Sequence, residues 1–511
     1  MPMNLKELLQ FLPECRVKGN ADISISSLQI DSRADQAGAC YVAIPGTKVD
    51  GNQFIADVVT RGALAIVSQK PCPSGMESIV WVQVADAHRA IGLLASAWYN
   101  FPSNALKVVG VTGTNGKTTT AFLVHSLFKR AWHRAGLLGT IITDDGKVKA
   151  EASQTTPGAL ALQGLLGRMV DNRCVGVAME VSSHAISQQR IAGVDFDVAI
   201  FTNLTQDHLD FHGNMENYFM AKAALFEEMA LNKTKKKKVA LINIDDSYGK
   251  RLVEILQGRM PIKTYGATLG ADFRMQTMQT SSQGCTYELT YKGKSYLIKS
   301  PLIGRFNMYN SLAALAGAVC AGLPIREAIA GIADSPQVPG RLEFAANKES
   351  IIAFVDYAHT PDAIENVCST VKEICPRRLI VVFGCGGDRD KSKRALMGKA
   401  AAKHADICIV TSDNPRNEDP DEIIRQICEG MPKGGVAAIT DRAEAIHAAV
   451  REARKGDIIL IAGKGHERYQ EFADGKRMNF NDVSRVRIEL GELEEMLNLQ
   501  RLENLKNKPE R

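Results

Sequence analysis

A glycine-rich loop between a strand and a helix constrains this 511-residue chain more than any other segment. The apolar run 107–112 has the pattern of a buried strand, and the residues after the loop have helical spacing. Backbone N–H groups of such a loop, and of the helix that follows it, can point at phosphate groups. The loop also carries a lysine that can reach the β- and γ-phosphates and a threonine hydroxyl suited to Mg²⁺. We therefore expect the chain to bind Mg-ATP through Gly113, Thr114, Asn115, Gly116, Lys117, Thr118 and Thr119.

The loop departs from the usual nucleotide-binding pattern G-x-x-x-x-G-K-[ST]. Val111 stands five positions before Gly116, so the first loop glycine is Gly113 and the loop is a shortened variant. Motor and switch NTPases pair such a loop with an apolar strand that ends in an acidic Mg²⁺ ligand. The run 175–180 ends in Glu180, and the Ser-Ser-His sequence shortly after it suits a substrate-binding loop better than a motor.

Chain length and the alternation of strand and helix patterns predict an α/β protein of three domains. Residues 1–102 mix short strands with short helices. Residues 103–336 alternate strand and helix, which indicates a central P-loop-type ATPase domain with a mainly parallel sheet. Residues 337–491 repeat the alternation and indicate a Rossmann-like C-terminal domain. Residues 492–511 have the pattern of a charged helical tail.

Apolar periodicity gives the expected elements. Asp86 has the position of an N-cap for a helix over 87–99, and the alanine-rich run 306–322 predicts a helix at the end of the central domain. We expect strands over 23–30, 39–44, 64–67, 79–84, 107–112, 175–180, 198–202, 239–244, 351–356, 378–384, 407–411 and 457–462.

Composition argues against several classes of protein. Hydrophobic residues make up 45% and charged residues 23%, so the chain can bury large cores. A net charge of +5 is weak support for a polyanionic partner, and the basic run Lys233–Lys238 favours a solvated loop over a nucleic-acid or membrane contact. The 11 cysteines form no C-x-x-C pair, which indicates a reducing compartment. Because there is no signal-like segment and no apolar run of about 18 residues, we expect a cytoplasmic protein.

Six segments, spread in order over nearly the whole chain, form a recognisable set. They are Gly113–Thr119, Glu180–His184, Asn203–Asp210, Gly304–Asn307, Pro339–Glu343 and Asp356–Pro361. Together they resemble the Mur ligase family. The resemblance implies an ATP-dependent amino-acid ligase of bacterial cell wall biogenesis, and through the cell wall a role in cell shape and division. The segment Asp413–Arg416 looks like the signature of the member that adds meso-2,6-diaminopimelate to UDP-N-acetylmuramoyl-L-alanyl-D-glutamate.

The resemblance implies a reaction in two steps. The γ-phosphate of ATP moves to the side-chain carboxylate of D-glutamate, and an amine then attacks the acyl phosphate to give an amide, ADP and phosphate. Because several anionic oxygens crowd this step, charge neutralisation and alignment dominate the catalysis. The residues implied as catalytic are Lys117, Glu180, His208 and Lys222.

Two Mg²⁺ sites would suit this chemistry. By the resemblance, Thr118 and Glu180 hold the first ion. His208 supplies a nitrogen ligand to the second, and Lys222, modified by CO₂ to a carbamate (N6-carboxylysine), supplies an oxygen ligand. From the local sequence alone, without the resemblance, His208 is interpreted as a loop histidine and Lys222 as an ordinary lysine on a helix face.

Three residues far from the loop in sequence would complete the ATP site. By the resemblance, Asn307 lies against adenine, Asp356 reaches the ribose and Arg341 reaches the phosphates. His359, near the same strand end, reads equally well as a turn histidine. Since Arg341 and Asp356 belong to the linker and the third domain, we expect domain closure to complete the site.

The first domain would bind the UDP end of the nucleotide-sugar dipeptide. The segment 31–33 follows a strand and is similar to the family's uridine contacts, and the loop 47–49 is the least similar part. Arg190 can pair with a carboxylate through two N–H groups, and Gln154 stands where relatives often have Asn. The residues implied for this substrate are Ile30, Ser32, Thr47, Lys48, Val49, Gln154, Thr155, Thr156, Ser182, Gln188 and Arg190.

A diaminopimelate site must hold a distal carboxylate that lysine lacks. Arg416 is suited to that carboxylate, and Glu467 can accept from the distal ammonium. A lysine ligand would leave Arg416 desolvated and unpaired, a loss of roughly 2–5 kcal/mol. Alternatively, Arg416 merely makes a local cap or pair. The residues implied for diaminopimelate are Arg389, Asp413, Asn414, Pro415, Arg416, Gly463 and Glu467.

Other functions stay open at this point. The segment 384–388 resembles a dinucleotide fingerprint, but Arg389 takes the place of its last glycine, which indicates a substrate loop and not an NAD site. Folylpolyglutamate synthase-like enzymes share the short loop, although segments 413–416 and 31–33 argue against them. A P-loop regulatory or motor ATPase would hydrolyse ATP without any amino acid. A monomer without nucleic-acid or membrane partners is the default expectation.

Overall fold

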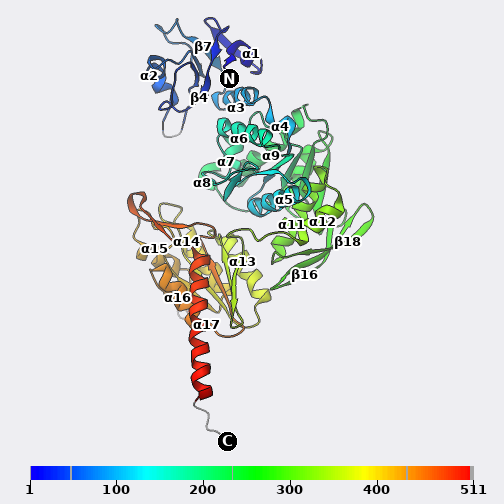
Figure 1. Cartoon of the computed structure of the whole chain (residues 1–511), viewed down its shortest axis with the longest axis vertical. Coiled ribbons are helices and arrows are strands. Elements are labelled where there is room, and N and C mark those ends of the chain that lie inside the picture. The colour runs from blue at the N-terminus through cyan, green and yellow to red at the C-terminus, as the bar shows by residue number, and fades with distance from the viewer. Residues whose placement is uncertain (1, 47–48, 233, 433–435, 507–511) are drawn as a thin grey trace. The chain divides into compact units, whose positions relative to one another are not determined.

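The computed structural model of the chain describes residues 2–46, 49–232, 234–432 and 436–506, without the side chains of 210 and 499–506. Its contacts divide the chain into two compact units. Unit 1 comprises Met1–Met275, Thr290–Lys294 and Asn310–Ile332, and unit 2 comprises Gln276–Leu289, Ser295–Tyr309 and Ala333–Arg511. Figure 1 traces the chain from its blue N-terminal part to the red helix near its C-terminus.

The N-terminal part of unit 1 is built on a five-stranded sheet. Its elements are β1 (Met3–Asn4), α1 (Leu5–Leu9), β2 (Cys15–Lys18), β3 (Ser24–Ile25), β4 (Ser27–Gln29), β5 (Ala39–Val42), α2 (Ile55–Thr60), β6 (Ala65–Ser68), β7 (Val80–Val84), α3 (Ala87–Trp98) and α4 (Pro102–Ala105). The strand order is β2-β7-β6-β5-β4, and all neighbours except β2 and β7 are parallel. The Asp86 carboxylate accepts from the N–H groups of His88 and Arg89, so the predicted N-cap of α3 is confirmed.

Residues 107–333, most of which belong to unit 1, form a larger sheet and the helices around it. Its elements are β8 (Lys107–Thr112), α5 (Lys117–Trp132), β9 (Ala135–Leu138), β10 (Ile142–Asp144), β11 (Lys149–Glu151), α6 (Ala159–Asp171), β12 (Gly176–Glu180), α7 (Ser183–Ser187), β13 (Val198–Phe201), α8 (Leu209–His212), α9 (Met215–Leu231), β14 (Val239–Asn243), α10 (Ser247–Leu256), β15 (Ile262–Gly266), β16 (Phe273–Ser281), β17 (Gly284–Tyr291), β18 (Lys294–Ser300), α11 (Arg305–Cys320) and α12 (Ile325–Ala333). The strand order is β11-β10-β9-β12-β8-β13-β14-β15-β16-β17-β18. Neighbours from β9 to β16 in this order are parallel.

The glycine loop joins β8 to α5 as predicted. Gly113 has φ 147°, and a Cβ atom there would lie 1.9 Å from the Thr202 hydroxyl oxygen. Only glycine can therefore bring the backbone this close to β13 and its following residue. Because β8 is central in the sheet and buried from Val108 onward, the loop is fixed on a rigid base.

Unit 2 is a doubly wound α/β domain with one antiparallel edge strand. Its elements are β19 (Glu343–Lys348), β20 (Ile351–Asp356), α13 (Pro361–Ile374), β21 (Leu379–Phe383), α14 (Lys393–His404), β22 (Ile407–Val410), α15 (Pro420–Cys428), β23 (Val436–Ala438), α16 (Arg442–Glu452), β24 (Ile458–Ala462), β25 (Tyr469–Glu471), β26 (Arg477–Asn479) and α17 (Asp482–Lys506). The strand order is β19-β20-β24-β21-β22-β23, and only β19 is antiparallel to its neighbour. Two apolar clusters cover the two faces of this sheet.

Three features differ from the expectations. The long strands β16, β17 and β18 were not predicted, because their alternating polar pattern lacks a continuous apolar run. The C-terminal helix α17 begins at Asp482, ten residues before the predicted tail. Lys235 of the basic run is not solvated, since its ammonium pairs with Asp197 and donates to the Leu106 carbonyl, whereas Lys236 and Lys237 are exposed.

All 11 cysteines lie in the described part of the chain, and each is a free thiol. Among the described residues, no helix has the length and apolar character needed to cross a membrane.

Candidate active site

The phosphate loop of unit 1 has an acidic partner at the end of the neighbouring strand. Strands β8 and β12 are parallel, with Glu180 paired to Val111, so the loop and Glu180 lie at the same sheet edge. The Thr118 hydroxyl donates to Glu180 Oε2 at 2.9 Å. Thr140 holds the same fully buried carboxylate through its N–H at 2.7 Å and its hydroxyl at 3.1 Å. A hydroxyl and a carboxylate at this spacing are hard oxygen donors of the type that Mg²⁺ prefers.

The loop is held by residues to which the sequence analysis assigned no individual role. The N–H of Asn115 donates to Asn203 Oδ1 at 2.9 Å, and the N–H of Thr114 donates to the Asn203 carbonyl at 2.9 Å. The Thr114 hydroxyl also contacts the Thr205 carbonyl and the Tyr218 hydroxyl, each at 3.2 Å. Asn203 and Thr205 belong to the segment that carried the resemblance, and the structure shows them supporting the loop.

Two lysines converge on one backbone oxygen of the loop. Lys117 Nζ donates to the Gly113 carbonyl at 3.0 Å, and Lys222 Nζ, from helix α9, donates to the same oxygen at 2.8 Å. Lys222 is 1% exposed, and its ammonium lies 4.5 Å from the centre of the Tyr218 ring. Burial first, and then the nearby charge of Lys117, lowers the pKa of Lys222 well below its ordinary value, although Asp207 acts in the opposite direction.

His208 lies beside these lysines in an unusual backbone conformation. Its φ is 53°, at the N-cap of α8, and its ring centroid is 4.9 Å from that of His184. Burial lowers the pKa of His208, and the charges of Lys117 and Lys222 act in the same direction, against the Asp207 carboxylate. A neutral imidazole is the form that binds metals. Among the described residues, however, no cluster of three His, Cys, Asp or Glu side chains forms a ready-made metal site.

Of the residues predicted for the nucleotide-sugar dipeptide, those from Gln154 to Arg190 would hold its muramoyl-dipeptide part, and they form one connected network. Arg190 donates to Gln154 Oε1 at 2.9 Å, to the Thr156 carbonyl at 3.0 Å and to Gln188 Oε1 at 2.6 Å. The Thr156 hydroxyl donates to the Glu180 carbonyl at 2.8 Å and accepts from the Ser182 N–H at 3.1 Å. Thr155 lies 3.0 Å from Thr140, hydroxyl to hydroxyl. The network therefore connects this group of residues to the carboxylate beside the phosphate loop.

The structure describes only some of the residues predicted for the UDP end of the substrate. Ile30 and Ser32 follow β4, and Val49 lies in the loop after β5. Because β4 and β5 are adjacent and parallel, both segments leave the same edge of the sheet. Ile30 and Val49 are exposed, as ligand contacts need to be. Thr47 and Lys48 lie outside the described residues.

The remaining residues predicted for ATP belong to unit 2. Asp356, at the end of β20, accepts from the N–H groups of Leu342 at 2.6 Å and Ala358 at 2.7 Å. Burial raises the pKa of Asp356. The Arg341 guanidinium stacks 4.9 Å from the Tyr357 ring centre, and the Asn307 amide donates to the Ile303 carbonyl at 2.9 Å. Their role toward the nucleotide stays a prediction.

The residues predicted for diaminopimelate gather at the carboxyl ends of three neighbouring strands of unit 2. Arg389 follows β21, the segment 413–416 follows β22, and Gly463 and Glu467 follow β24. Gly463 has φ 116°, and a Cβ there would lie 2.8 Å from Asp413 Oδ2. Ligands of doubly wound sheets bind at this edge. The sequence therefore predicted a group that the fold does assemble.

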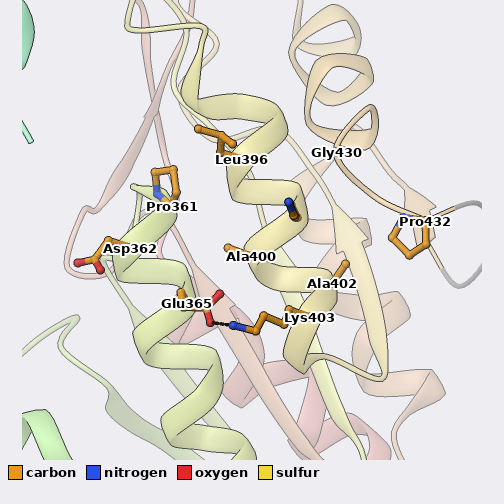
Figure 2. A pocket seen from close by; sticks show the side chains of 10 residues that line it. Pro361, Asp362, Glu365, Leu396, Ala400, Ala402, Lys403, Gly430 and Pro432 are labelled. Atoms are coloured by element: carbon orange, nitrogen blue, oxygen red, sulfur yellow. Dashed lines mark hydrogen bonds and ion pairs between the residues drawn. The ribbon is translucent and has the colours of Figure 1, made fainter. Parts of the chain in front are cut away.

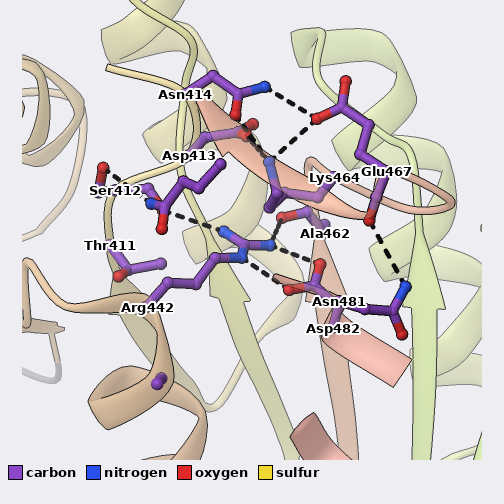
Figure 3. A network of polar contacts seen from close by, with 12 residues as sticks. Thr411, Ser412, Asp413, Asn414, Arg442, Ala462, Lys464, Glu467, Asn481 and Asp482 are labelled. Atoms are coloured by element: carbon purple, nitrogen blue, oxygen red, sulfur yellow. Dashed lines mark hydrogen bonds and ion pairs between the residues drawn. The ribbon is translucent and has the colours of Figure 1, made fainter. Parts of the chain in front are cut away.

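Arg416 is held in place by protein partners. Its Nε donates to Glu471 Oε2 at 3.0 Å, and its Nη1 donates to the Gly387 carbonyl at 2.8 Å. Asn414 Nδ2 donates to Glu467 Oε2 at 2.8 Å, as Figure 3 shows. Glu471 was missed because it belongs to β25 and lies 55 positions from Arg416 in sequence.

A separate open pocket of about 580 Å³ lies between α13, α14 and the end of α15 (Figure 2). Its walls include Asp362, Glu365, Leu396 and Lys399, and Lys403 pairs with Glu365 across it. None of the residues predicted for substrates lines this pocket. The pocket is therefore distinct from the predicted substrate sites.

Three family models match successive parts of the chain. "Mur ligase family, catalytic domain" matches residues 24–99, "Mur ligase middle domain" matches 111–318, and "Mur ligase, glutamate ligase domain" matches 340–465. Together they account for most of the chain in the order expected of one protein.

Individual relatives extend the match. A UDP-N-acetylmuramoyl-L-alanyl-D-glutamate--2,6-diaminopimelate ligase of Syntrophomonas wolfei subsp. wolfei (strain DSM 2245B / Goettingen) is 41% identical over 483 residues, which cover 94% of this chain and 97% of the relative. A solved structure of a UDP-N-acetylmuramoyl-L-alanyl-D-glutamate--2,6-diaminopimelate ligase has a TM-score of 0.71 and 32% identity, and covers 96% of this chain and 99% of its own.

A more distant neighbour shares the fold alone. The Mycobacterium tuberculosis folylpolyglutamate synthase, complexed with ADP and AMPPCP, has a TM-score of 0.60 at 18% identity, and covers 74% of this chain and 92% of its own. The mostly parallel sheets of both units and the solved neighbours confirm the expected three-domain α/β fold. From the three family models and the near-full-length relative, the chain belongs to the Mur ligase family.

Proposed function

We propose that this protein is the ATP-dependent ligase that joins meso-2,6-diaminopimelate to the D-glutamate side-chain carboxylate of UDP-N-acetylmuramoyl-L-alanyl-D-glutamate, in peptidoglycan synthesis. The observation that carries the proposal is a pair of fixed groups at one sheet edge, the Arg416 guanidinium held by Glu471 and the Glu467 carboxylate held by Asn414. Such a pair complements a distal carboxylate and a distal ammonium on one amino acid. Near-full-length relatives named for this reaction support it.

The phosphate loop would align ATP for attack by a carboxylate. Lys117 would leave the Gly113 and Thr114 carbonyls, where it lies at 3.0 and 2.8 Å, to meet the phosphates. Thr118 and Glu180 are the residues that would hold Mg²⁺, because their oxygens already lie 2.9 Å apart at the loop. When bound, Mg²⁺ neutralises charge that develops on the phosphate oxygens.

Lys222 would act as a carbamate. Burial and the charge of Lys117 lower the pKa of Lys222, which favours its neutral amine, and only the neutral amine can attack CO₂. Its nitrogen would form a bond to the CO₂ carbon and release a proton, leaving a carboxylate on a long arm. The carbamate would place a negative charge beside the Lys117 ammonium, and the two opposite charges attract each other. His208, beside both lysines, would supply the neutral nitrogen ligand of a second Mg²⁺.

The amino-acid site would discriminate against lysine. Arg416 has only one described carboxylate partner, Glu471, and a carboxylate of the ligand would complete its pairing. A lysine ligand has no such group, so the guanidinium would lose a partner in a partly buried place. We further propose that the enzyme works as a monomer in the cytoplasm; free cysteines are in line with such a reducing compartment.

Phosphate release separates this function from the alternatives. The purified protein is given Mg-ATP and the UDP-dipeptide, with diaminopimelate, lysine or glutamate supplied singly. Release that requires both the dipeptide and diaminopimelate is expected. Release with glutamate would indicate a folylpolyglutamate synthase-like activity, and release without any amino acid would indicate a simple ATPase.

A further inference from the structure

Two loops of unit 2 carry most of the side chains assigned to the amino acid. One leaves β22 and contains Asp413–Arg416, and the other leaves β24 and contains Gly463–Glu467. Both loops are bound by charged side chains that have no part in the proposed reaction. Figure 3 shows how these side chains lie beneath and between the loops.

The lower support is a buried ion pair, Arg442 with Asp482. Arg442 Nε and Nη2 donate to the two carboxylate oxygens of Asp482, each at 2.8 Å, and neither side chain is exposed. The same guanidinium donates to the Ser412 carbonyl at 3.3 Å and to the Ala462 carbonyl at 3.0 Å. These carbonyls stand directly before Asp413 and Gly463, so one side chain ties down the start of both loops.

The upper support is Lys464, which lies between the loops. Its ammonium donates to Asn414 Oδ1 at 2.8 Å, to Glu467 Oε2 at 3.0 Å and to Asp413 Oδ1 at 3.4 Å, and its side chain is not exposed. Two carboxylates from different loops thus share one buried cation. Without that cation they would repel each other in a place of low polarity.

This arrangement leaves one oxygen of Glu467 and one nitrogen of Arg416 available to a ligand. Glu467 Oε2 accepts from both Lys464 and Asn414, whereas its Oε1 accepts no hydrogen bond from the described part of the chain. Arg416 uses Nε and Nη1 internally, and its Nη2 makes no hydrogen bond with a described residue. The site therefore offers one acceptor and one donor in fixed positions, which lowers the entropy cost of binding a zwitterionic end.

We infer that Lys464 is a positioning residue for amino-acid recognition. The ion pair of Arg442 with Asp482 anchors the two loops whose side chains Lys464 positions. The inference rests on the proposed function, because it concerns the amino-acid substrate of that reaction. Lys464 does not touch the substrate in this scheme. It orients Glu467 Oε1 and holds the Asn414 side chain in position. Loss of Lys464 therefore weakens binding of the amino acid and leaves the phosphate loop, which belongs to unit 1, unaffected.

The test compares Lys464→Met with wild type in steady-state kinetics for each of the three substrates. Methionine keeps an unbranched apolar side chain, one atom shorter, and removes the charge and the hydrogen bonds. We expect KM for diaminopimelate to rise about tenfold to a hundredfold. KM for ATP and for the UDP-dipeptide should change less than about threefold, as should kcat measured well below the melting temperature of the variant. Lys403→Met, which removes an exposed lysine on α14, is the matched control and should match wild type.

A conservative variant separates positioning from general stability. Lys464→Gln can still donate to Asn414 and Glu467. Its KM for diaminopimelate should therefore lie between those of wild type and Lys464→Met, whatever the melting temperature of the variant. If Lys464→Met does not fold, Lys464→Gln and Arg442→Lys carry the same comparison, with the same selective rise expected. An equal change in all three KM values, or no change in any, overturns the inference. Wild-type turnover requiring diaminopimelate is measured first, because its absence would refute the proposed function instead.

Discussion

Lys117 and Lys222 donate to the same acceptor, the Gly113 carbonyl, at 3.0 and 2.8 Å. Two ammonium groups so close together repel each other unless one loses its charge. Lys222 is the buried one, and its pKa is lowered by burial and by Lys117. The lowered pKa favours the neutral amine that reacts with CO₂, which is the chemical reason to expect a carbamate at this position. The shared acceptor links the glycine loop to helix α9.

Removing Lys222 should abolish ligation. We expect Lys222→Ala to lower kcat by roughly a hundredfold or more, since a group that organises charge in the transition state is lost. Added short carboxylates such as formate or acetate should restore part of the rate by occupying the vacated space. Phosphate release with and without these anions measures both effects.

Lys250→Ala, at an exposed lysine on the neighbouring helix α10, is the control and should behave as wild type with no response to carboxylates. Full activity of Lys222→Ala would rule out the carbamate.

The Glu180 carboxylate should set the Mg²⁺ requirement. Its contacts with Thr118 and Thr140 hold it rigidly at the loop, so Glu180→Gln keeps the shape and removes the negative charge. The Mg²⁺ concentration for half-maximal activity should rise roughly tenfold or more. A Mg²⁺ titration of phosphate release measures it, with exposed Glu151→Gln as the control. An unchanged Mg²⁺ dependence would remove Glu180 from the metal site.

Selectivity for diaminopimelate should depend on Arg416. Because Arg416 has φ 51°, Arg416→Asn is preferable to alanine, since asparagine tolerates this backbone region. The ratio of kcat/KM for diaminopimelate to that for lysine should fall about 30-fold or more, which corresponds to roughly 2 kcal/mol. Competition between the two amino acids measures the ratio. Arg425→Gln, on the exposed side of α15, should leave it unchanged, and an unchanged ratio in Arg416→Asn would contradict the assignment.

The sequence predicted those parts of the site that are local in the chain. The loop Gly113–Thr119 and the strand end at Glu180 each follow from a short pattern, and the structure brings them together because parallel strands end at the same sheet edge. Supports that come from distant positions left no such pattern. Thr140 and Arg442 act through contacts 40 positions away in sequence, with Glu180 and Asp482, and only the fold reveals them.

For the basic run Lys233–Lys238, a local pattern predicted the environment of some residues and failed for one. Its composition predicted a solvated loop, and two of its lysines do face solvent. Lys235 is held by Asp197 because the run lies beside the residue that precedes β13, which no charge pattern indicates.

Acid should destabilise the protein partly through His466. Burial, then Arg341 and Lys464, lowers the pKa of His466 from 6.5 to about 4. Between pH 6.5 and 4 the unfolded chain takes up a proton at this position and the folded chain does not, so stability falls as pH falls through that window. The loss is at most about 3 kcal/mol.

Urea unfolding at several pH values measures this slope. His466→Gln should have a shallower dependence between pH 6.5 and 4 than wild type, whereas His133→Asn, at an exposed position with φ 64°, should keep the wild-type slope. A wild-type slope in His466→Gln would show that this histidine is not responsible.

The central claim is that a carboxylate, and not water, receives the γ-phosphate of ATP. It is tested most directly with UDP-N-acetylmuramoyl-L-alanyl-D-glutamate labelled with ¹⁸O in the glutamate side-chain carboxylate, turned over with Mg-ATP and diaminopimelate. Mass spectrometry of the released phosphate should show one ¹⁸O atom from the carboxylate for each amide formed. Phosphate without the label would contradict the acyl-phosphate route and with it the role given to the loop at Gly113.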